Sequence, residues 1–448
     1  MQGAGLSRPT SPRQTQPESG LELDWNRQHP YASRVVASES GVPLAPWWES
    51  AGPGSLGPGT YALVIGVSRY DNLPPLGDSE APPWSMGMSQ LESAALSAAG
   101  FAEWLMTTHF LPDAPLSAVW LLLSPSDAEY ARLAPDKRRA PLALAANVLN
   151  AATAWRAACR SNAGNVGLLY AAGHGLGVDR DKPGILLLQD FANDPVDALL
   201  ENTLNLTRVH GNLAGSQGGS PRRQFSFFDA CRPRSTLTLT SDLAESPPLW
   251  TIPVVPTAQA SPMFLGAAVG TVAYGVPGEG TLFWQALRTC LESDAVDLLD
   301  DGSWGVTDDR LYAALSRRLR ELAAAVGRDQ QAAVIPTSGG VALHVNKSPP
   351  SCEKSFAVRP SKAGSYSFAT LRHSVREPPV FSGVALESPY SHVVSAGTYE
   401  LEVMIDPSQP EFEDTRTWEF LRPRGPRDIV ADVGAVIPSE TRVEAAVE

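Results

Sequence analysis

The sequence predicts an α/β fold with a mainly parallel sheet flanked by helices, followed by a small C-terminal all-β sandwich. Apolar runs such as YALVIGV, LSAVWLLL and NVGLLYAA alternate with segments whose apolar residues repeat at helical spacing. Unbroken apolar runs are typical of parallel strands that helices cover on both faces. After residue 346 the chain changes to short segments that alternate apolar and polar residues between turns, which is typical of a sandwich.

The elements of the first part follow one another as strand and helix. The first strand begins at Tyr61, and the next segment repeats Leu91, Ala95 and Ala98 with the spacing of one helix face. Thr307 is expected to be the N-cap of the last helix, because Thr is favoured at that position. The strands are expected at 61–70, 116–123, 165–175, 184–190, 223–232, 263–276 and 340–345, and the helices at 88–110, 140–161, 203–213, 280–293 and 308–326.

Composition divides the chain into three regions. Residues 1–58 are rich in Pro, Gly and Ser and are expected to form a disordered leader with one docking segment at Trp47 and Trp48. Residues 59–346 make up the α/β domain. The segment KSPPSCEKS is expected to be a linker, and residues 353–448 a β-sandwich that serves as an interaction domain.

Charge and hydropathy argue against several classes of function. The 448 residues carry a formal net charge of −13, which disfavours nucleic acid and anionic membranes as partners because both surfaces are negatively charged. A basic run at 316–322 is expected to be a solvated helix face. The sequence starts without the apolar segment of a signal peptide, and no apolar run reaches the roughly 20 residues that cross a bilayer. We therefore expect a cytoplasmic protein without a membrane span.

Of the four cysteines, only Cys231 lies in a sequence context that suggests a chemical role. Cytoplasmic thiols stay reduced, so a disulfide framework is not expected. Cys159 and Cys290 continue the apolar stripes of two predicted helices and are expected to fill the core, whereas Cys352 falls in the Pro-rich linker. No two cysteines have CxxC spacing, and His174 and Cys231 lie far from other ligands in the sequence, so no metal site is predicted.

Cys231 and His174 stand at the carboxyl ends of two predicted strands, RQFSFFDACR and NVGLLYAAGHG. Such ends meet at one edge of a parallel sheet, where ligand sites form. A thiol attacks as thiolate, and a histidine can remove its proton. Either residue alone is equally well explained as structural, Cys231 as a buried strand residue and His174 as a hydrogen-bonded loop residue. Together they predict a catalytic dyad.

Four motifs carry a resemblance to a known family. They are YALVIGVSRYDNLPPL as the opening strand, LLYAAGHG with the histidine, FFDACR with the cysteine, and AYGVPGEGTLFWQALRTCL with the following VTDDRLYAAL. In this order they resemble the caspase-like cysteine peptidases and, among these, the bacterial metacaspase-like (orthocaspase) branch. The separation of 57 residues from position 174 to position 231 is close to the roughly 50 typical of caspases. The resemblance covers residues 60–346 and implies a caspase-like fold.

The resemblance implies a role for each residue of the dyad. Cys231 would be the nucleophile and His174 the general acid and base, with the backbone N–H groups of Gly175 and Cys231 forming the oxyanion hole. Glycines beside the histidine suit this role because they let the backbone approach a substrate carbonyl closely. Thiol acyl transfer requires no cofactor, and the calcium activation found in some metacaspases stays open.

The resemblance also implies a substrate pocket. Asp229 lies two residues before the thiol, on the same strand face, and would bind a basic substrate side chain. The second pocket acid of metacaspases falls on Ser97 in the best register, which leaves one carboxylate instead of two. Alternatively, Asp229 pairs with Arg232 or caps the next turn. Asp190 and Asp71 follow other strands and are expected to be a solvated strand end and a turn residue.

The sequence therefore predicts a cysteine endopeptidase that cleaves proteins or peptides after Arg or Lys. The polar, Pro-rich loop 232–262 suggests a zymogen that is cut there, by itself or by an upstream activating protease. Arg234 is the candidate processing site, because Pro233 hinders cleavage after Arg232. Family analogy implies a role in bacterial defence or cell death. The alternatives are a catalytically inactive scaffold and a hydrolase of non-peptide substrates. A dinucleotide-binding loop at GHGLG is disfavoured, because Val178 stands where that motif needs Gly.

Overall fold

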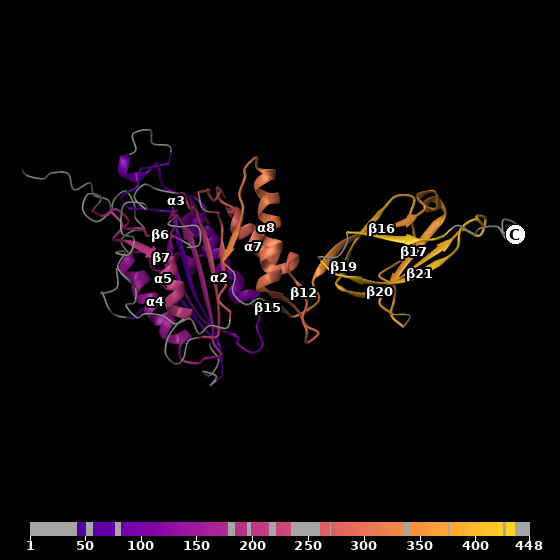
Figure 1. Ribbon diagram of the computed structural model, residues 1–448, viewed down its shortest axis with the longest axis horizontal. Coiled ribbons are helices and arrows are strands. Elements are labelled where there is room, and N and C mark those ends of the chain that lie inside the picture. The colour runs from indigo at the N-terminus through magenta and orange to yellow at the C-terminus, as the bar shows by residue number, and fades with distance from the viewer. Residues whose placement is uncertain are drawn as a thin grey trace, which may run out of the picture. The chain divides into compact units, whose positions relative to one another are not determined.

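The computed structural model describes most of the chain after residue 42. The described residues are 43–50, 57–76, 82–177, 184–194, 199–214, 221–233, 260–268, 270–335, 340–374, 376–423 and 427–434. They form an α/β part around a central sheet and a C-terminal part made of two further sheets (Figure 1). None of the described helices combines the length and the apolar content needed to span a bilayer.

The central sheet is parallel through its middle and has antiparallel edges. Its strand order is β1-β3-β2-β4-β8-β9-β14. Neighbours from β3 to β9 run parallel, whereas β1 and β14 run antiparallel to their partners. The bounds are β1 Trp48–Glu49, β2 Thr60–Val67, β3 Leu116–Ser124, β4 Val166–Gly173, β8 Arg223–Ala230, β9 Met263–Leu265 and β14 Ala333–Ile335. The predicted mainly parallel sheet is confirmed.

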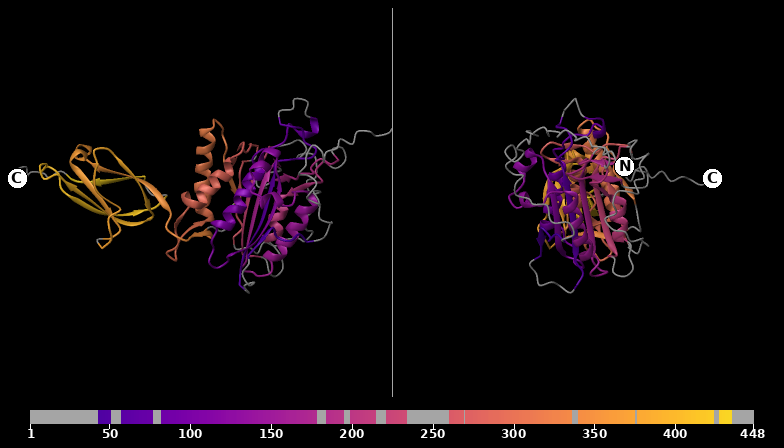
Figure 2. Two further views of the ribbon diagram at one scale, coloured as in Figure 1. Left: turned by 180° about the vertical axis from the view of Figure 1, so that it is seen from behind. Right: turned by 90° about the vertical axis from the view of Figure 1, so that its left-hand side faces the viewer.

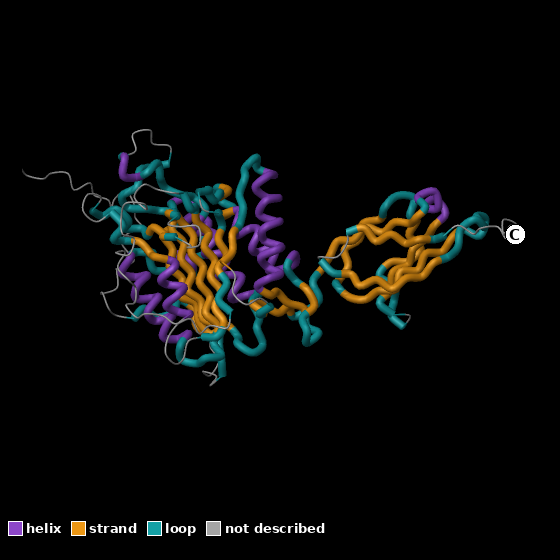
Figure 3. The backbone as a smooth tube through the Cα atoms, viewed as in Figure 1, coloured by secondary structure: helices purple, strands orange, loops and turns teal. Residues whose placement is uncertain are grey.

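Helices cover both faces of this sheet (Figures 2 and 3). Because side chains alternate along a strand, Val64 of β2 belongs to one apolar core with α2, α7 and α8, whereas Ile65 belongs to a second core with α4 and α5. The helices are α2 Ala94–Thr107, α3 Asp127–Arg132, α4 Ala145–Cys159, α5 Leu206–Ala214, α7 Leu282–Thr289 with a π-helical turn Cys290–Asp294, and α8 Asp308–Ala325, with 3-10 turns at Pro83–Ser85, Lys137–Arg139 and Ser361–Tyr366. Cys159 and Cys290 are fully buried in these cores, as predicted.

Short strands form three small sheets beside the central one. They are β5 Gly175–Leu176, β6 Ile185–Leu187 and β7 Thr203–Asn205; β10 Gly275–Val276 and β11 Gly280–Thr281; and β12 Asp297–Leu298, β13 Trp304–Thr307 and β15 Ala342–Asn346. The segment predicted as a helix from residue 203 thus begins as a strand. Thr307 does precede α8, but its side chain accepts no hydrogen bond from the helix backbone.

The predicted single strand over 263–276 is wrong, because only its two ends, Met263–Leu265 (β9) and Gly275–Val276 (β10), are strands, and they belong to different sheets. Only Met263–Leu265 pairs within the central sheet. Gly270 adopts a positive φ of 84°, a conformation that breaks a strand. The backbone there turns to the end of β8 instead, with hydrogen bonds between Gly270 N–H and Arg232 O and between Arg232 N–H and Thr271 O. The apolar residues of this segment therefore form a strap beside Cys231, which we call the 270–274 strap.

The C-terminal part is a sandwich of two sheets with the orders β19-β16-β22 and β18-β17-β20-β21 around one apolar core. Its strands are β16 Ser351–Arg359, β17 Ser367–Arg372, β18 Phe381–Ala385, β19 Tyr390–Ser395, β20 Gly397–Ile405, β21 Thr415–Leu421 and β22 Asp428–Asp432. The predicted sandwich is confirmed, but β16 and β22 pair in parallel. The linker interpretation of Cys352 is wrong, because this residue lies in β16 and is only 6% exposed.

Part of the leader segment lies on the central sheet. Trp48 of β1 pairs with Val119 of the edge strand β3, and the Trp120 indole N–H donates to the carbonyl oxygen of Leu44 at 2.8 Å. These contacts place the segment around Trp47 against the sheet edge. Residues 1–42 and 51–56 lie outside the described residues.

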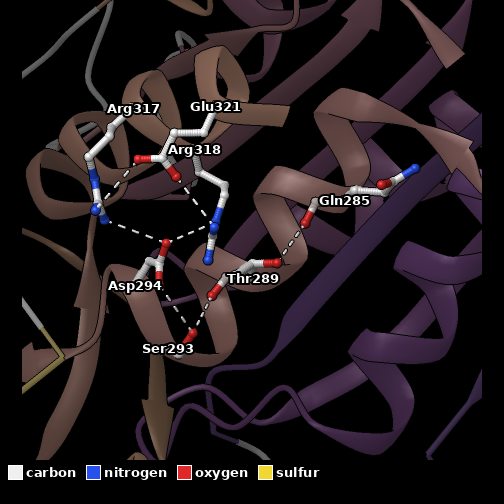
Figure 4. A network of polar contacts seen from close by, with 7 residues as sticks. All are labelled: Gln285, Thr289, Ser293, Asp294, Arg317, Arg318 and Glu321. Carbon is white, nitrogen blue, oxygen red and sulfur yellow. Dashed lines mark hydrogen bonds and ion pairs between the residues drawn. The ribbon is translucent and has the colours of Figure 1, made fainter. Parts of the chain in front are cut away.

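The basic face of α8 is partly engaged in ion pairs, in contrast to the solvated face expected for 316–322. The Asp294 carboxylate at the π-helical turn lies 3.5 Å from Arg317 Nη2 and 3.1 Å from Arg318 Nε. Glu321 pairs with both arginines from their own helix (Figure 4). Partly exposed pairs of this kind contribute little individually, but here they connect α8 to the end of α7.

Candidate active site

Strand register brings His174 and Cys231 to adjacent positions. Gly173 of β4 pairs with Ala230 of β8, so the next residue of each strand leaves the sheet at the same level, and such strands lie about 4.8 Å apart. Gly175 packs directly on the backbone of Cys231, because an added Cβ would lie 2.5 Å from the Cys231 carbonyl oxygen. Glycine is therefore required at position 175.

His174 is half-buried and is held at its backbone and at its ring. Its backbone N–H donates to Tyr70 Oη at 2.7 Å, and its Nε2 lies 2.6 Å from the carbonyl oxygen of Ser89. A carbonyl only accepts, so the hydrogen of the neutral ring is assigned to Nε2 and Nδ1 is left as the basic nitrogen. Burial lowers the pKa of His174 from its ordinary value, with the Ser89 hydrogen bond acting against this. The ring is therefore neutral at pH 7 and can accept a proton.

The Cys231 thiol is partly exposed and contacts the 270–274 strap. The Ala273 N–H donates to Sγ at 3.1 Å, and the thiol lies 3.5 Å from the Ala273 carbonyl oxygen. Burial raises the pKa of Cys231, the Ala273 N–H opposes this increase, and the negative charge of Asp229 adds to it. The resting site is thus a neutral thiol beside a neutral imidazole, so attack requires proton transfer to the base.

Asp229 is 2% exposed and points into a polar network between β4, β8 and α7. Its Oδ2 accepts hydrogen bonds from Tyr170 Oη, at 2.7 Å, and from Thr281 Oγ1. Its Oδ1 is buried and has no hydrogen-bond partner in the described part of the chain. Burial raises the pKa of Asp229 to about 6, against the lowering effect of Thr281 and Tyr170. Among the described residues Arg232 is not a partner of this carboxylate, so the alternative pairing is not observed.

Ser97 joins the same network through Thr281. It is fully buried in α2, and its Oγ accepts the Thr281 backbone N–H at 2.8 Å and lies 3.1 Å from Thr281 Oγ1. Sequence reasoning missed Thr281 and Tyr170. Thr281 caps α7 by accepting the Trp284 N–H, so a Thr at the start of the helix predicted over 280–293 was the available signal. Tyr170 offered none beyond its place on the strand that leads to His174.

The remaining candidate residues lie elsewhere or outside the described residues. Asp190 accepts the Ala145 N–H at 3.0 Å at the start of α4, so it caps a helix and is not a solvated strand end. Asp71 accepts from Gln189 Nε2 at 2.9 Å. Arg234 and most of the loop 232–262 lie outside the described residues.

A family model described as the caspase domain matches residues 60–318. The chain belongs to the caspase-domain family. This caspase domain contains both residues of the candidate dyad and the Asp229 network, and it makes the protein a cysteine-type peptidase.

Among solved structures, the chain is similar to caspase-1 from Spodoptera frugiperda, with 12% identity and a TM-score of 0.34 over 66% of this chain and 94% of that chain. None of the curated proteins matches this chain. The match to the caspase domain ends within α8, so the sandwich lies outside it.

Proposed function

We propose that the protein is a cysteine endopeptidase in which Cys231 and His174 form the catalytic dyad and which cleaves after Arg or Lys. The observation that carries the proposal is the pairing of β4 with β8, which sets both residues side by side at the carboxyl edge of the sheet. The neutral imidazole, with Nδ1 left unprotonated, supports its role as base.

The reaction follows the usual course of thiol acyl transfer. His174 Nδ1 accepts the thiol proton as Cys231 Sγ forms a bond to the scissile carbonyl carbon. The negative oxygen that develops is stabilised by the backbone N–H groups of Gly175 and Cys231. The imidazolium then gives its proton to the departing amine as the C–N bond breaks. Water, deprotonated by His174, finally hydrolyses the thioester and regenerates the thiol.

Asp229 supports the proposed preference for basic side chains. Its Oδ2 is already used by two protein donors, whereas the buried Oδ1 has no hydrogen-bond partner among the described residues, so a substrate cation would pair with Oδ1 once the side chains over it move aside. A buried carboxylate without a cation is costly, so a substrate guanidinium or ammonium is favoured and an acidic side chain is repelled. Ser97 supplies no second charge, which makes this a one-carboxylate pocket.

A panel of fluorogenic peptides tests the proposal. The purified full chain is incubated with otherwise identical peptides that end in Arg, Lys, Asp or Leu, and protein alkylated with iodoacetamide is the control. We expect turnover of the Arg and Lys peptides that is abolished by alkylation. Turnover of the Asp peptide alone would contradict the basic pocket, and a folded protein inactive on every peptide would favour the inactive scaffold.

We further propose that the enzyme is made as a zymogen that is processed in the loop 232–262, with Arg234 as the cleavage site. The support is chemical: the enzyme's own preference for a basic residue would recognise Arg234, whereas the bond after Arg232 precedes Pro233. A caspase relative processed in this way would fit a role in bacterial defence. On denaturing gels, we expect wild type to form two fragments and Cys231→Ala to remain intact unless an upstream protease is added. A fully active wild-type chain that stays uncut would refute processing.

A further inference from the structure

The side chain of Gln90 is linked to Tyr70 and to Ser89, two of the residues that contact His174. Its Oε1 accepts the Tyr70 backbone N–H at 2.8 Å, and its Nε2 donates to the carbonyl oxygens of Tyr70 and Leu73, both at 2.8 Å. Both hydrogens of the amide and its oxygen are therefore used on backbone groups. Gln90 lies in the segment between β2 and α2, directly after Ser89.

This arrangement connects the Tyr70 and Ser89 contacts of His174 to one side chain. Ser89, which presents its carbonyl oxygen to Nε2, is the chain neighbour of Gln90. Tyr70, whose hydroxyl accepts the His174 backbone N–H, has both of its backbone polar groups bound by Gln90. The Tyr70 ring also lies against the imidazole, with ring centroids 5.1 Å apart. A displacement of Gln90 would therefore move both supports of the histidine.

We propose that Gln90 is a positioning residue that keeps His174 in the Nε2–H tautomer with Nδ1 free to act as base. The inference rests on the proposed dyad for its catalytic meaning. The Ser89 carbonyl can bind only a protonated nitrogen, so its fixed position selects the tautomer. Once the carbonyl is free to move, His174 becomes a mixture of the Nε2–H and Nδ1–H tautomers. In the Nδ1–H tautomer, Nδ1 cannot accept the thiol proton.

The test compares Gln90→Met and Gln90→Glu with wild type. Met fills the same space without hydrogen bonds, and Glu keeps the acceptor but places an oxygen against two carbonyl groups. Asn165→Leu is the matched control. Like Gln90, Asn165 binds backbone groups through its side-chain amide, here those of Gly59, Ala158 and Cys159, but it precedes β4 at the opposite end of the strand. All three variants are made in the full chain.

Two measurements are expected to change in the Gln90 variants. On the Arg peptide, kcat falls about 10- to 100-fold while KM changes little, because misplacing a reacting group costs this much. In the Cys231→Ala background, ¹⁵N spectra of the ring nitrogens, assigned with His174→Gln, show the Nε2–H tautomer in the parent and a mixture in the Gln90 variants. The pKa of His174 moves further below its ordinary value, because the Ser89 hydrogen bond that raises it is weakened while burial continues to lower it.

The outcomes separate a positioning role from a structural one. Asn165→Leu is expected to unfold at lower temperature and to leave the tautomer and the shape of the pH profile unchanged. If Asn165→Leu alters the tautomer as Gln90→Met does, or if both Gln90 variants keep the parental tautomer and kcat, the inference is overturned. If wild type has no activity that depends on Cys231, the proposed function fails, but the spectra still decide whether Gln90 sets the tautomer.

Discussion

Cys231→Ala is expected to lower kcat/KM for the Arg peptide by about 10⁴-fold or more, as removal of the nucleophile does in other acyl-transfer enzymes. The loss is large because no other described thiol adjoins His174. His174→Ala is expected to cost a similar factor, and the double variant little more, because the two residues act as one unit. Steady-state kinetics on the peptide panel measure all three.

The other cysteines provide the control for this result. Cys352 lies in the sandwich, outside the matched caspase domain, so Cys352→Ala should keep kcat/KM within about twofold while losing a small amount of sandwich stability. Residual turnover by Cys231→Ala at more than about a hundredth of the wild-type rate would rule out Cys231 as the nucleophile.

Asp229→Asn is expected to lower kcat/KM for the Arg and Lys peptides by roughly 30- to 1,000-fold, because removing one partner of a buried charge pair costs about 2–4 kcal/mol. The Leu peptide, which makes no ion pair, should lose much less. The substitution keeps the shape of the side chain and an oxygen for Tyr170 and Thr281. The ratio of Arg to Leu turnover therefore isolates the charge.

The pH dependence follows from the raised pKa of Asp229. With this pKa at about 6, the carboxylate is charged above pH 6 and neutral below it, so the Arg-to-Leu ratio should rise with pH through that value in wild type and stay flat in Asp229→Asn. The effect on folding has the opposite sign. A raised carboxyl pKa means that stability is lost as pH rises from the unfolded value near 4 to about 6.

Asp229→Asn should therefore be more stable than wild type at pH 7, by about 1–3 kcal/mol, while it is less active on basic substrates. This combination distinguishes a pocket residue from a structural one. If the Asn variant melts at a lower temperature and keeps its Arg-to-Leu ratio, Asp229 serves the fold, and the preference for basic residues needs another origin.

The spacing of apolar residues along the chain was sufficient to predict the main strands of the central sheet. The strand before His174 is an unbroken apolar run and the strand before Cys231 has an apolar centre around Phe227, and both lie in the central sheet as expected. The 263–276 run was misjudged because apolar content alone does not show that Gly270 turns the backbone. Cys352 was misplaced because two prolines made a strand start resemble a linker, and the parallel pairing of β16 with β22 leaves no trace in either segment.

The contacts that complete the candidate site are separated too widely for sequence reasoning to connect them. Ser89 and His174 are 85 residues apart, and Asp229 and Thr281 are 52 residues apart. Ser89 contributes only its backbone carbonyl oxygen, so no side chain identifies it. Gln90 uses a common residue type to bind backbone atoms, which only the folded chain reveals. The candidate dyad can be proposed from residue types, whereas the groups that contact it cannot.

The order of these contacts along the chain has a consequence for protein synthesis. Cys231 and His174 are translated before the loop 232–262, but Ala273 and Thr281, which contact Cys231 and Asp229, are translated after it. A nascent chain that has reached only residue 233 holds both residues of the proposed dyad, but it lacks the 270–274 strap and the threonine that contacts Asp229. We therefore expect the peptidase to stay inactive on the ribosome until α7 has emerged. The host cell would thus be spared proteolysis by unfinished copies of the enzyme.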